Sequence, residues 1–214
     1  MDEKIADIRK DYSHRSLQET EIDSNPIKQF DSWWKEALEA NITEANAMTV
    51  ATSSTDGMPS ARIMLLKGFS ERGFVFFTNY NSFKAQQLTE NPRVCLVFFW
   101  KELERQVRIT GIIEKTSHAE NDAYFQSRPK ASQLGAITSP QSQVIESRQW
   151  LDDRYKKLTE QSEKIAIQRP AHWGGYLVKP VIIEFWQGRP GRLHDRIQYS
   201  LLDDGSWKIE RLAP

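Results

Sequence analysis

From residue 47 onward, most of the chain consists of short runs rich in β-branched and aromatic residues, many of them separated by brief turns. Parallel strands need a crossover of about a dozen residues or more, whereas antiparallel strands can be joined by a tight turn. The spacing therefore predicts antiparallel hairpins. No glycine-rich loop follows the first strand, so neither a Rossmann nor a P-loop fold is indicated. The expected strands cover residues 47–53, 60–68, 73–79, 93–100, 104–116, 176–186, 192–201 and 207–212.

Helices are expected before and between these strands. Asn25-Pro26 opens one of them, since proline is tolerated in the first turn. Its buried face is predicted to hold Ile27, Phe30, Trp34, Ala37 and Leu38. Further helices are expected over 82–90, over 117–128, where Ser117 and Glu120 form a capping box, and over 143–163. The fold class is therefore mainly β (α+β), an antiparallel barrel with flanking helices.

A length of 214 residues fits one domain of ordinary size, or at most two very small ones, and can bury a core without disulfides. Residues 1–25 are polar and are expected to form a mobile or conditionally ordered N-terminal arm, leaving 26–214 as the single domain. A formal net charge of zero argues against binding to nucleic acid or anionic lipid by bulk electrostatics. The single cysteine, Cys95, excludes an intrachain disulfide and a multi-cysteine metal site. The N-terminus is charged, unlike a signal peptide, and the longest apolar run, 94–100, is too short to span a membrane. The sequence therefore predicts no membrane segment and a cytoplasmic location.

The first candidate ligand segment is the strand Arg62–Lys67, which has a cation near each end and apolar residues between. Period-2 alternation places Arg62, Met64 and Leu66 on one face and Ile63, Leu65 and Lys67 on the other. Such a strand fits an elongated anionic ligand. Taken alone, the pattern favours the alternative, an edge strand whose charged ends prevent aggregation.

Two more segments could hold phosphate. Phe77 and Thr78 lead into a helix whose N-terminal N–H groups, together with Ser82 and Lys84, suit an anion; alternatively, Ser82 only caps the helix. The aromatic strand before it resembles part of an RNA-recognition motif, but lacks the full pattern. Tyr124 and Arg128 share a helical face, and with Lys130 and Ser132 in the following loop they suit a second anion. The alternative is a set of cations that complements the helix dipole.

The segment Glu184–Arg196 carries the strongest functional pattern. On a strand, Arg192, His194 and Arg196 would face the same side, which is a poor arrangement for a core. It suits an anion or an electron-rich ring, and the nearby Phe185 and Trp186 weaken the alternative of a solvated face.

At this point several motifs, in order, resemble the pyridoxine (pyridoxamine) 5′-phosphate oxidase family. The residues that carry the resemblance are Arg62–Lys67, Leu103–Val107, Ser127-Arg128-Pro129 with Ser132-Gln133, Trp173-Gly174-Gly175, Glu184–Gln187, Arg192–Arg196 and Trp207–Pro214. The resemblance implies an FMN-binding split β-barrel that works as a homodimer with FMN at its interface. It also implies oxidation of pyridoxine or pyridoxamine 5′-phosphate to pyridoxal 5′-phosphate, with O₂ as acceptor and H₂O₂ as product.

The resemblance further implies roles for individual residues. Arg192 and His194 correspond to catalytic residues, with His194 either accepting a proton or only positioning the substrate. Flavin contacts correspond to Arg62, Ile63, Met64, Leu65, Leu66, Lys67, Phe77, Thr78, Lys84, Gln106, Gln141, Ser142, Trp186 and Arg196. Substrate contacts correspond to Arg9, Tyr12, Lys67, Tyr124, Arg128, Ser132, Arg192, Leu193 and His194. Phe83 stands where the family commonly has arginine, which predicts a weaker grip on the FMN phosphate.

Two alternatives stay open. A flavin reductase-like or stress-related FMN protein would use the same barrel, although Arg9, Tyr12 and the 192–194 element favour the oxidase. A non-catalytic module that binds RNA or a partner protein is the other alternative. Bound flavin would exclude it.

Overall fold

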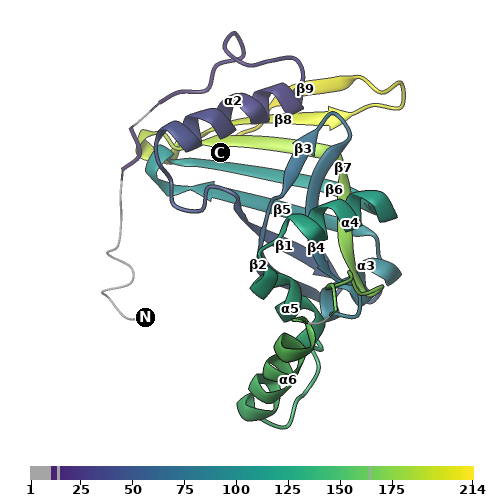
Figure 1. The fold of residues 1–214 in the computed structure, drawn as a ribbon. Coiled ribbons are helices and arrows are strands. Elements are labelled where there is room, and N and C mark those ends of the chain that lie inside the picture. Colours follow the sequence, from purple (N-terminus) through teal and green to yellow (C-terminus); the bar gives the residue numbers. More distant parts are fainter. Residues whose placement is uncertain (1–10, 14, 164) are drawn as a thin grey trace, which may run out of the picture.

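The computed structural model describes residues 11–13, 15–163 and 165–214. Nine strands form one sheet in the described part of the chain, with the order β2-β1-β5-β6-β7-β4-β3 and with β8 and β9 continuing from β7 (Figure 1). The strands are β1 (Ala47–Ser53), β2 (Pro59–Leu65), β3 (Gly68–Ser70), β4 (Gly73–Asn79), β5 (Arg93–Trp100), β6 (Arg105–Lys115), β7 (Trp173–Gln187), β8 (Asp195–Leu201) and β9 (Trp207–Arg211).

All strand pairs are antiparallel, which confirms the prediction from the short turns. The β1–β2 hairpin pairs Ala47 with Leu65, and its turn contains Gly57 at φ +88°, a conformation that favours glycine. The long β6–β7 pair forms the centre of the sheet. Its register shifts between Thr110 and Gly111, and such a bulge increases local twist. The sheet therefore curls into an antiparallel half-barrel.

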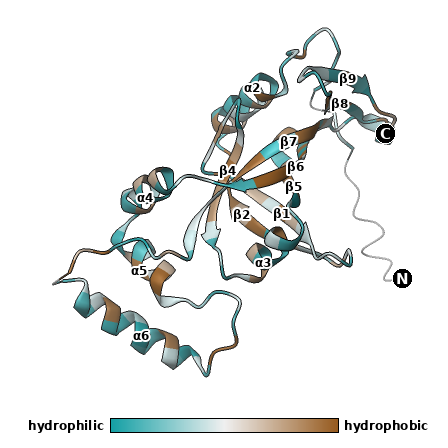
Figure 2. Cartoon of the chain, turned by 90° about the vertical axis from the view of Figure 1, so that its right-hand side faces the viewer, coloured by the Kyte–Doolittle hydropathy of each residue, from teal (hydrophilic) through white to brown (hydrophobic). Residues whose placement is uncertain are grey.

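Helix α2 (Pro26–Glu39) covers the upper part of the sheet in Figure 1 and closes the core. Asn25 caps it as expected, because its Oδ1 accepts hydrogen bonds from the N–H groups of Ile27 and Lys28. Phe30 is fully buried against the rings of Phe74 and Phe98. Figure 2 shows hydrophobic residues along the central strands beneath this helix.

The predicted buried face of this helix is partly wrong. Trp33 is 3% exposed and packs edge-on against Phe185, whereas Leu38 is 51% exposed and Trp34 is only partly buried. The buried residues Phe30, Trp33 and Ala37 follow a spacing of three and four, so the helix is rotated slightly from the predicted orientation.

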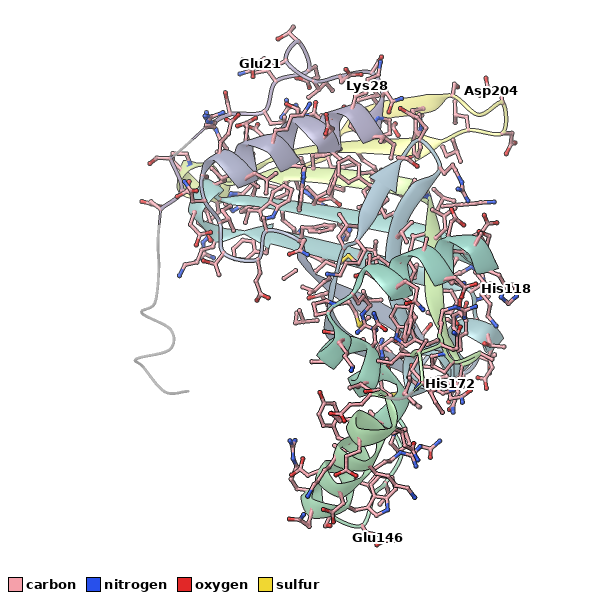
Figure 3. The ribbon with its side chains drawn as sticks, in the orientation of Figure 1. Glu21, Lys28, His118, Glu146, His172 and Asp204 are labelled. Carbon is pink, nitrogen blue, oxygen red and sulfur yellow. The ribbon has the colours of Figure 1, made fainter. Side chains whose placement is uncertain are left out.

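The remaining α-helices lie below α2 in the view of Figure 1. They are α3 (Phe83–Glu90), α4 (His118–Ser127), α5 (Lys130–Thr138) and α6 (Arg148–Gln161). The Ser117–Glu120 capping box of α4 is present as predicted. Helix α5 occupies a segment that was expected to be a loop, and α6 begins five residues later than expected. Figure 3 labels Glu146 at the end of this projecting helical region.

Part of the predicted N-terminal arm contacts the domain. Leu17 is 4% exposed and belongs to the core cluster, and its N–H donates to Asp195 Oδ2 at 3.0 Å. The mobility of the arm and the boundary at residue 25 stay predictions. No helix in the described ranges is long and apolar enough to cross a membrane. The cytoplasmic location stays a prediction.

Candidate active site

Two adjoining cavities lie between β2, β4 and the helices α3, α4 and α5. The larger has a volume of about 500 Å³, the smaller about 360 Å³, and both are lined by Ile63, Met64 and Gln141. These volumes suit a small ligand. We call the joined space the cation cleft, because its lining includes Arg62, Lys67, Lys84 and Arg128. The other predicted site residues that line this cleft are Leu65, Phe77, Thr78, Tyr124, Ser132 and Ser142.

Strand β2 is an edge strand, as the alternative interpretation of Arg62–Lys67 predicted, but its residues also line the cleft. Leu66 does not line either cavity and is buried in the core. Phe83, at the start of α3, lines the smaller cavity and is 52% exposed.

The smaller end of the cleft holds Arg62 and Lys84. Arg62 is fixed by hydrogen bonds to Thr52 Oγ1 and Ser60 Oγ, both at 2.7 Å. Lys84 Nζ lies 3.3 Å from Thr78 Oγ1 and 3.4 Å from Gln141 Oε1. Burial, reinforced by the charge of Arg62, lowers the pKa of Lys84 to about 8. Two adjacent cations held by neutral partners would be stabilised by a bound anion.

Two backbone features shape the smaller end of the cleft: the start of α3 at Ser82 and the turn at Ser142. Ser82 stands at the N-cap position of α3, but its hydroxyl donates to Asn79 O at 2.7 Å and makes no capping bond, so the alternative in which the Ser82 side chain only caps the helix is wrong. Ser142 has φ +70°, a conformation that non-glycine residues rarely adopt. This turn directly follows Gln141, which lies beside Lys84.

The larger end is built from stacked aromatic rings. The centroid of the Phe77 ring lies 3.9 Å from that of Tyr124 and 5.5 Å from that of Trp173, and the ring planes are nearly parallel in both pairs. The Arg128 guanidinium lies 4.6 Å above the Trp173 ring. Burial lowers the pKa of Arg128 and raises that of Tyr124.

Arg128 is poised for an acceptor. Its Nη1 is buried and has no hydrogen-bond partner among the residues that the structure describes, which is costly for a polar atom unless a ligand satisfies it. Ser132 and Lys67 line the same cavity. Ser132 lies in the first turn of α5, because 130–138 is helical; the prediction that placed it in a loop is wrong. Trp173 was part of a quoted motif but was not predicted as a site residue.

A second group of predicted residues surrounds Trp186. Measured between ring centroids, Trp186 lies 4.7 Å from His194 and 5.7 Å from Tyr12. The Tyr12 and His194 rings are 5.9 Å apart. We call Tyr12, Trp186 and His194 the aromatic cluster. His194 Nδ1 accepts a hydrogen bond from the Arg189 N–H at 3.1 Å. In the neutral ring the proton therefore lies on Nε2, which becomes a donor.

The predicted strand face of Arg192, His194 and Arg196 is wrong. Pro190–Arg192 is a 3-10 turn in which Gly191 and Arg192 both have φ 62°, and β8 begins only at Asp195. Arg192 and Leu193 are exposed, whereas Arg196 Nε donates to Glu184 Oε1 at 2.8 Å. The Pro-Gly pair favours a turn over a strand.

The cation cleft and the aromatic cluster lie at opposite ends of β7. Trp173 begins this strand and Trp186 lies near its end, so about 40 Å of extended chain separates them. Gln106 pairs with Trp186 and belongs with the second group. In Figure 3 His118 lies at the start of α4, whereas His172 lies lower in the view, directly before β7. Arg9 lies outside the described residues.

An antiparallel half-barrel with flanking helices defines the split β-barrel class. Residues 34–162 match the family described as pyridoxamine 5′-phosphate oxidase, and residues 173–214 match the pyridoxine 5′-phosphate oxidase C-terminal dimerisation region. The chain is 58% identical to a pyridoxine/pyridoxamine 5′-phosphate oxidase from Trichormus variabilis over 214 residues, 100% of both chains. The chain belongs to the pyridoxamine 5′-phosphate oxidase family.

Two solved structures are similar in fold. PhzG from Burkholderia lata, in complex with tetrahydrophenazine-1-carboxylic acid, has a TM-score of 0.88 at 29% identity, covering 94% of this chain and 100% of that one. A pyridoxamine 5′-phosphate oxidase-related, FMN-binding protein from Nostoc punctiforme has a TM-score of 0.70 at 19% identity, covering 90% and 100%. The predicted split barrel is thereby confirmed.

Proposed function

We propose that this protein is an FMN-dependent oxidase that converts pyridoxine and pyridoxamine 5′-phosphates to pyridoxal 5′-phosphate. O₂ is the electron acceptor and H₂O₂ the product; the amine substrate also takes up water and releases ammonia. One observation carries the proposal. Arg62, Lys67, Lys84 and Arg128 line one cleft, and none of them pairs with a carboxylate among the residues that the structure describes.

The residues of the smaller end fit the phosphate of FMN. Lys84 is buried without an acidic partner, and Arg62 is held in place beside it by neutral groups. We assign these two cations, with Ser142, to the cofactor phosphate, and Met64, Leu65 and Gln141 to the walls beside the ring system. When bound, FMN accepts two electrons from the substrate and returns them to O₂.

The larger end fits the substrate phosphate. Arg128 presents a buried, unpaired N–H group, and Lys67, Tyr124 and Ser132 line the same space. Arginine binds phosphate with two parallel hydrogen bonds, and the Trp173 ring restricts its orientation. Two separate anion-binding ends match a cofactor and a substrate that each carry one phosphate.

The complete site requires two copies of the chain. Trp186, Arg192, Leu193, His194 and Arg196 all fall within the matched dimerisation region, far along β7 from the cation cleft. We propose a homodimer in which the aromatic cluster of one copy closes the cation cleft of the other, with FMN, Gln106 and Trp186 at the interface. Arg9 and Tyr12 would then cover the substrate.

His194 is assigned to positioning. Because Nδ1 already accepts the Arg189 N–H, Nε2 offers a proton and cannot accept one while the ring is neutral. His194 therefore donates to the substrate ring, and the exposed Arg192 adds a second contact that fixes the reacting carbon.

The test is formation of pyridoxal 5′-phosphate by purified protein supplemented with FMN. Both phosphorylated substrates are assayed in air and under nitrogen, with H₂O₂ measured in parallel. We expect equal amounts of aldehyde and H₂O₂ in air and no sustained turnover under nitrogen. Bound flavin without turnover on either substrate would contradict the proposal and favour another flavoprotein activity on this barrel.

A further inference from the structure

The N-terminal segment formed by Tyr12, Ser13 and residues 15–17 is held by specific contacts, and this docked segment includes a member of the aromatic cluster. The Ser13 N–H donates to Glu104 Oε2 at 2.9 Å. Arg211 Nη2 donates to Leu17 O at 2.8 Å, and Arg211 also pairs with Glu19. Tyr12 thus enters the cluster from a segment that is held at positions 13, 17 and 19, on the C-terminal side of Tyr12.

Gly188 provides the space for Tyr12. A Cβ atom at position 188 would lie 2.7 Å from Tyr12 Cγ, 2.8 Å from Tyr12 Cβ and 3.0 Å from Tyr12 Cδ2, the three nearest heavy atoms. Side-chain carbons do not approach this closely, so any larger residue would displace the ring. Gly188 does not have positive φ, unlike Gly191 nearby. Its lack of a side chain therefore serves the contact with Tyr12.

Glu104 lies beside Gly188 in a rigid turn. It is 5% exposed and has φ +55°, the left-handed conformation that costs energy for a non-glycine residue. Its carbonyl accepts the Gly188 N–H at 2.7 Å and the Gln187 Nε2 amide at 3.2 Å. Gln187 is completely buried and also donates to Leu103 O. The turn is thus held in place independently of the docked segment.

We propose that Glu104 and Gly188 form a receptor for the docked segment, and that Glu104 is a positioning residue that places Tyr12 against His194. Glu104 accepts a hydrogen bond from the backbone N–H of Ser13, one residue after Tyr12. Gly188 leaves the space that the Tyr12 ring occupies. The inference rests on the proposed function, in which this cluster closes over substrate. It adds the two residues that set the closed position of the segment.

A purely structural role predicts a different outcome. If the contacts only stabilised the fold, Gly188→Ala would lower the melting temperature and leave catalysis intact. If they position Tyr12, Gly188→Ala would act only through that ring. A double-mutant cycle with Tyr12→Ala separates the two cases.

The first experiment measures KM and kcat for pyridoxine 5′-phosphate in Gly188→Ala, Tyr12→Ala and the double variant. We expect Gly188→Ala to raise KM about tenfold, which is within the range of interaction energies between residues in direct contact. In the Tyr12→Ala background, Gly188→Ala should have no further effect on KM. Gly68→Ala is the matched control, because a Cβ there meets nothing within 4 Å. An equal effect of Gly188→Ala with and without Tyr12 would overturn the proposal.

The second experiment does not depend on activity. Trypsin cleavage after Arg15 requires the docked segment to leave its receptor, and mass spectrometry follows loss of residues 1–15. We expect Gly188→Ala and Glu104→Asn to speed this cleavage about tenfold. Asparagine tolerates the left-handed turn but is one carbon shorter, whereas Glu104→Gln keeps an acceptor at the same reach and should speed cleavage clearly less than Glu104→Asn.

The two experiments fail in different ways. Unchanged cleavage in both Gly188→Ala and Glu104→Asn would refute the receptor, even if the protein oxidises its substrate normally. Faster cleavage in a protein that shows no oxidase activity would support the receptor and refute the proposed function.

Discussion

At the scale of single residues, the electrostatics of the cation cleft are unusual because no carboxylate in the described part of the chain pairs with the buried Lys84. Burial and the nearby Arg62 lower the pKa of Lys84 to about 8. A bound phosphate would stabilise the protonated amine and raise this pKa again. Binding of the phosphate above pH 8 must therefore be accompanied by proton uptake.

This linkage predicts how FMN affinity depends on pH. Between pH 7 and 8 the amine is mostly protonated in both states, so the Kd changes little. Above pH 8 only the free form loses its proton, and the Kd should rise by up to about tenfold per pH unit. Fluorescence titration of the protein with FMN measures this, with Lys84→Met as the variant that should lose the pH dependence. Riboflavin is the control ligand; the same pH dependence with riboflavin would contradict the role of Lys84.

Arg128 gives a second prediction at this scale. Replacing it with methionine keeps much of the contact with Trp173 but removes the charged hydrogen bonds to phosphate. Such bonds are worth about 1.5–3 kcal/mol, which corresponds to a rise in substrate KM of about 10- to 100-fold. Because the phosphate does not react, kcat should change little.

Steady-state kinetics with pyridoxamine 5′-phosphate test this prediction. Arg148→Met is the matched control, since Arg148 lies on α6 with an 82% exposed side chain that pairs with Asp152. A large fall in kcat with an unchanged KM in Arg128→Met would argue against a phosphate-binding role.

At the scale of elements, helix α2 depends on its cap. Asn25→Ala removes the acceptor for two N–H groups and should lower the free energy of unfolding by about 0.5–2 kcal/mol. Urea denaturation measures the change. Asn25→Ser keeps an acceptor at this position and should lose clearly less stability; equal losses in both variants would show that the cap bond is not the cause.

Most strands of this fold are predictable because their pattern and turns are local. The 104–116 strand and the capping box at Ser117 and Glu120 follow directly from residue spacing. The predictions are wrong where packing between elements sets the orientation of a side chain or helix. The rotation of α2 is set by the rings that receive Phe30 and Trp33, and no pattern within the helix contains that information.

The site shows the same division. The sequence indicates Arg62–Lys67 as a possible anion site because a cation lies near each end of the strand, and Arg128 because it shares a helical face with Tyr124. It does not indicate roles for Glu104 or Gly188, because those roles depend on a segment that lies 91 residues from Glu104 and farther still from Gly188. The turn at Arg192 was missed because alternation along 192–196 resembles a strand, although Pro190 and Gly191 precede it.

At the scale of the whole molecule, the separation of the two residue groups predicts complementation between chains. Arg128→Met impairs the cation cleft, and His194→Asn impairs the aromatic cluster at the other end of β7. In a mixed dimer, one site receives both defects and the other receives none. Randomly paired equal mixtures should therefore recover about a quarter of the parent activity at limiting substrate, more than the mean of the two variants alone.

The measurement is turnover after denaturing and refolding the two variants together. The parent protein, refolded in the same way, sets the reference. The same two variants refolded separately and then combined give the baseline. Activity of the co-refolded mixture equal to that baseline would contradict a site shared between chains.

The length of β7 has an evolutionary consequence. Its fifteen residues join a ring of one site, Trp173, to a ring of the other, Trp186, without an intervening loop. An inserted or deleted residue would reverse the facing of every later side chain and disturb both sites of the dimer together. Selection should therefore tolerate changes of length around α6 far more readily than within this strand, and gene variants that change the length of β7 should be rare even where single substitutions are frequent.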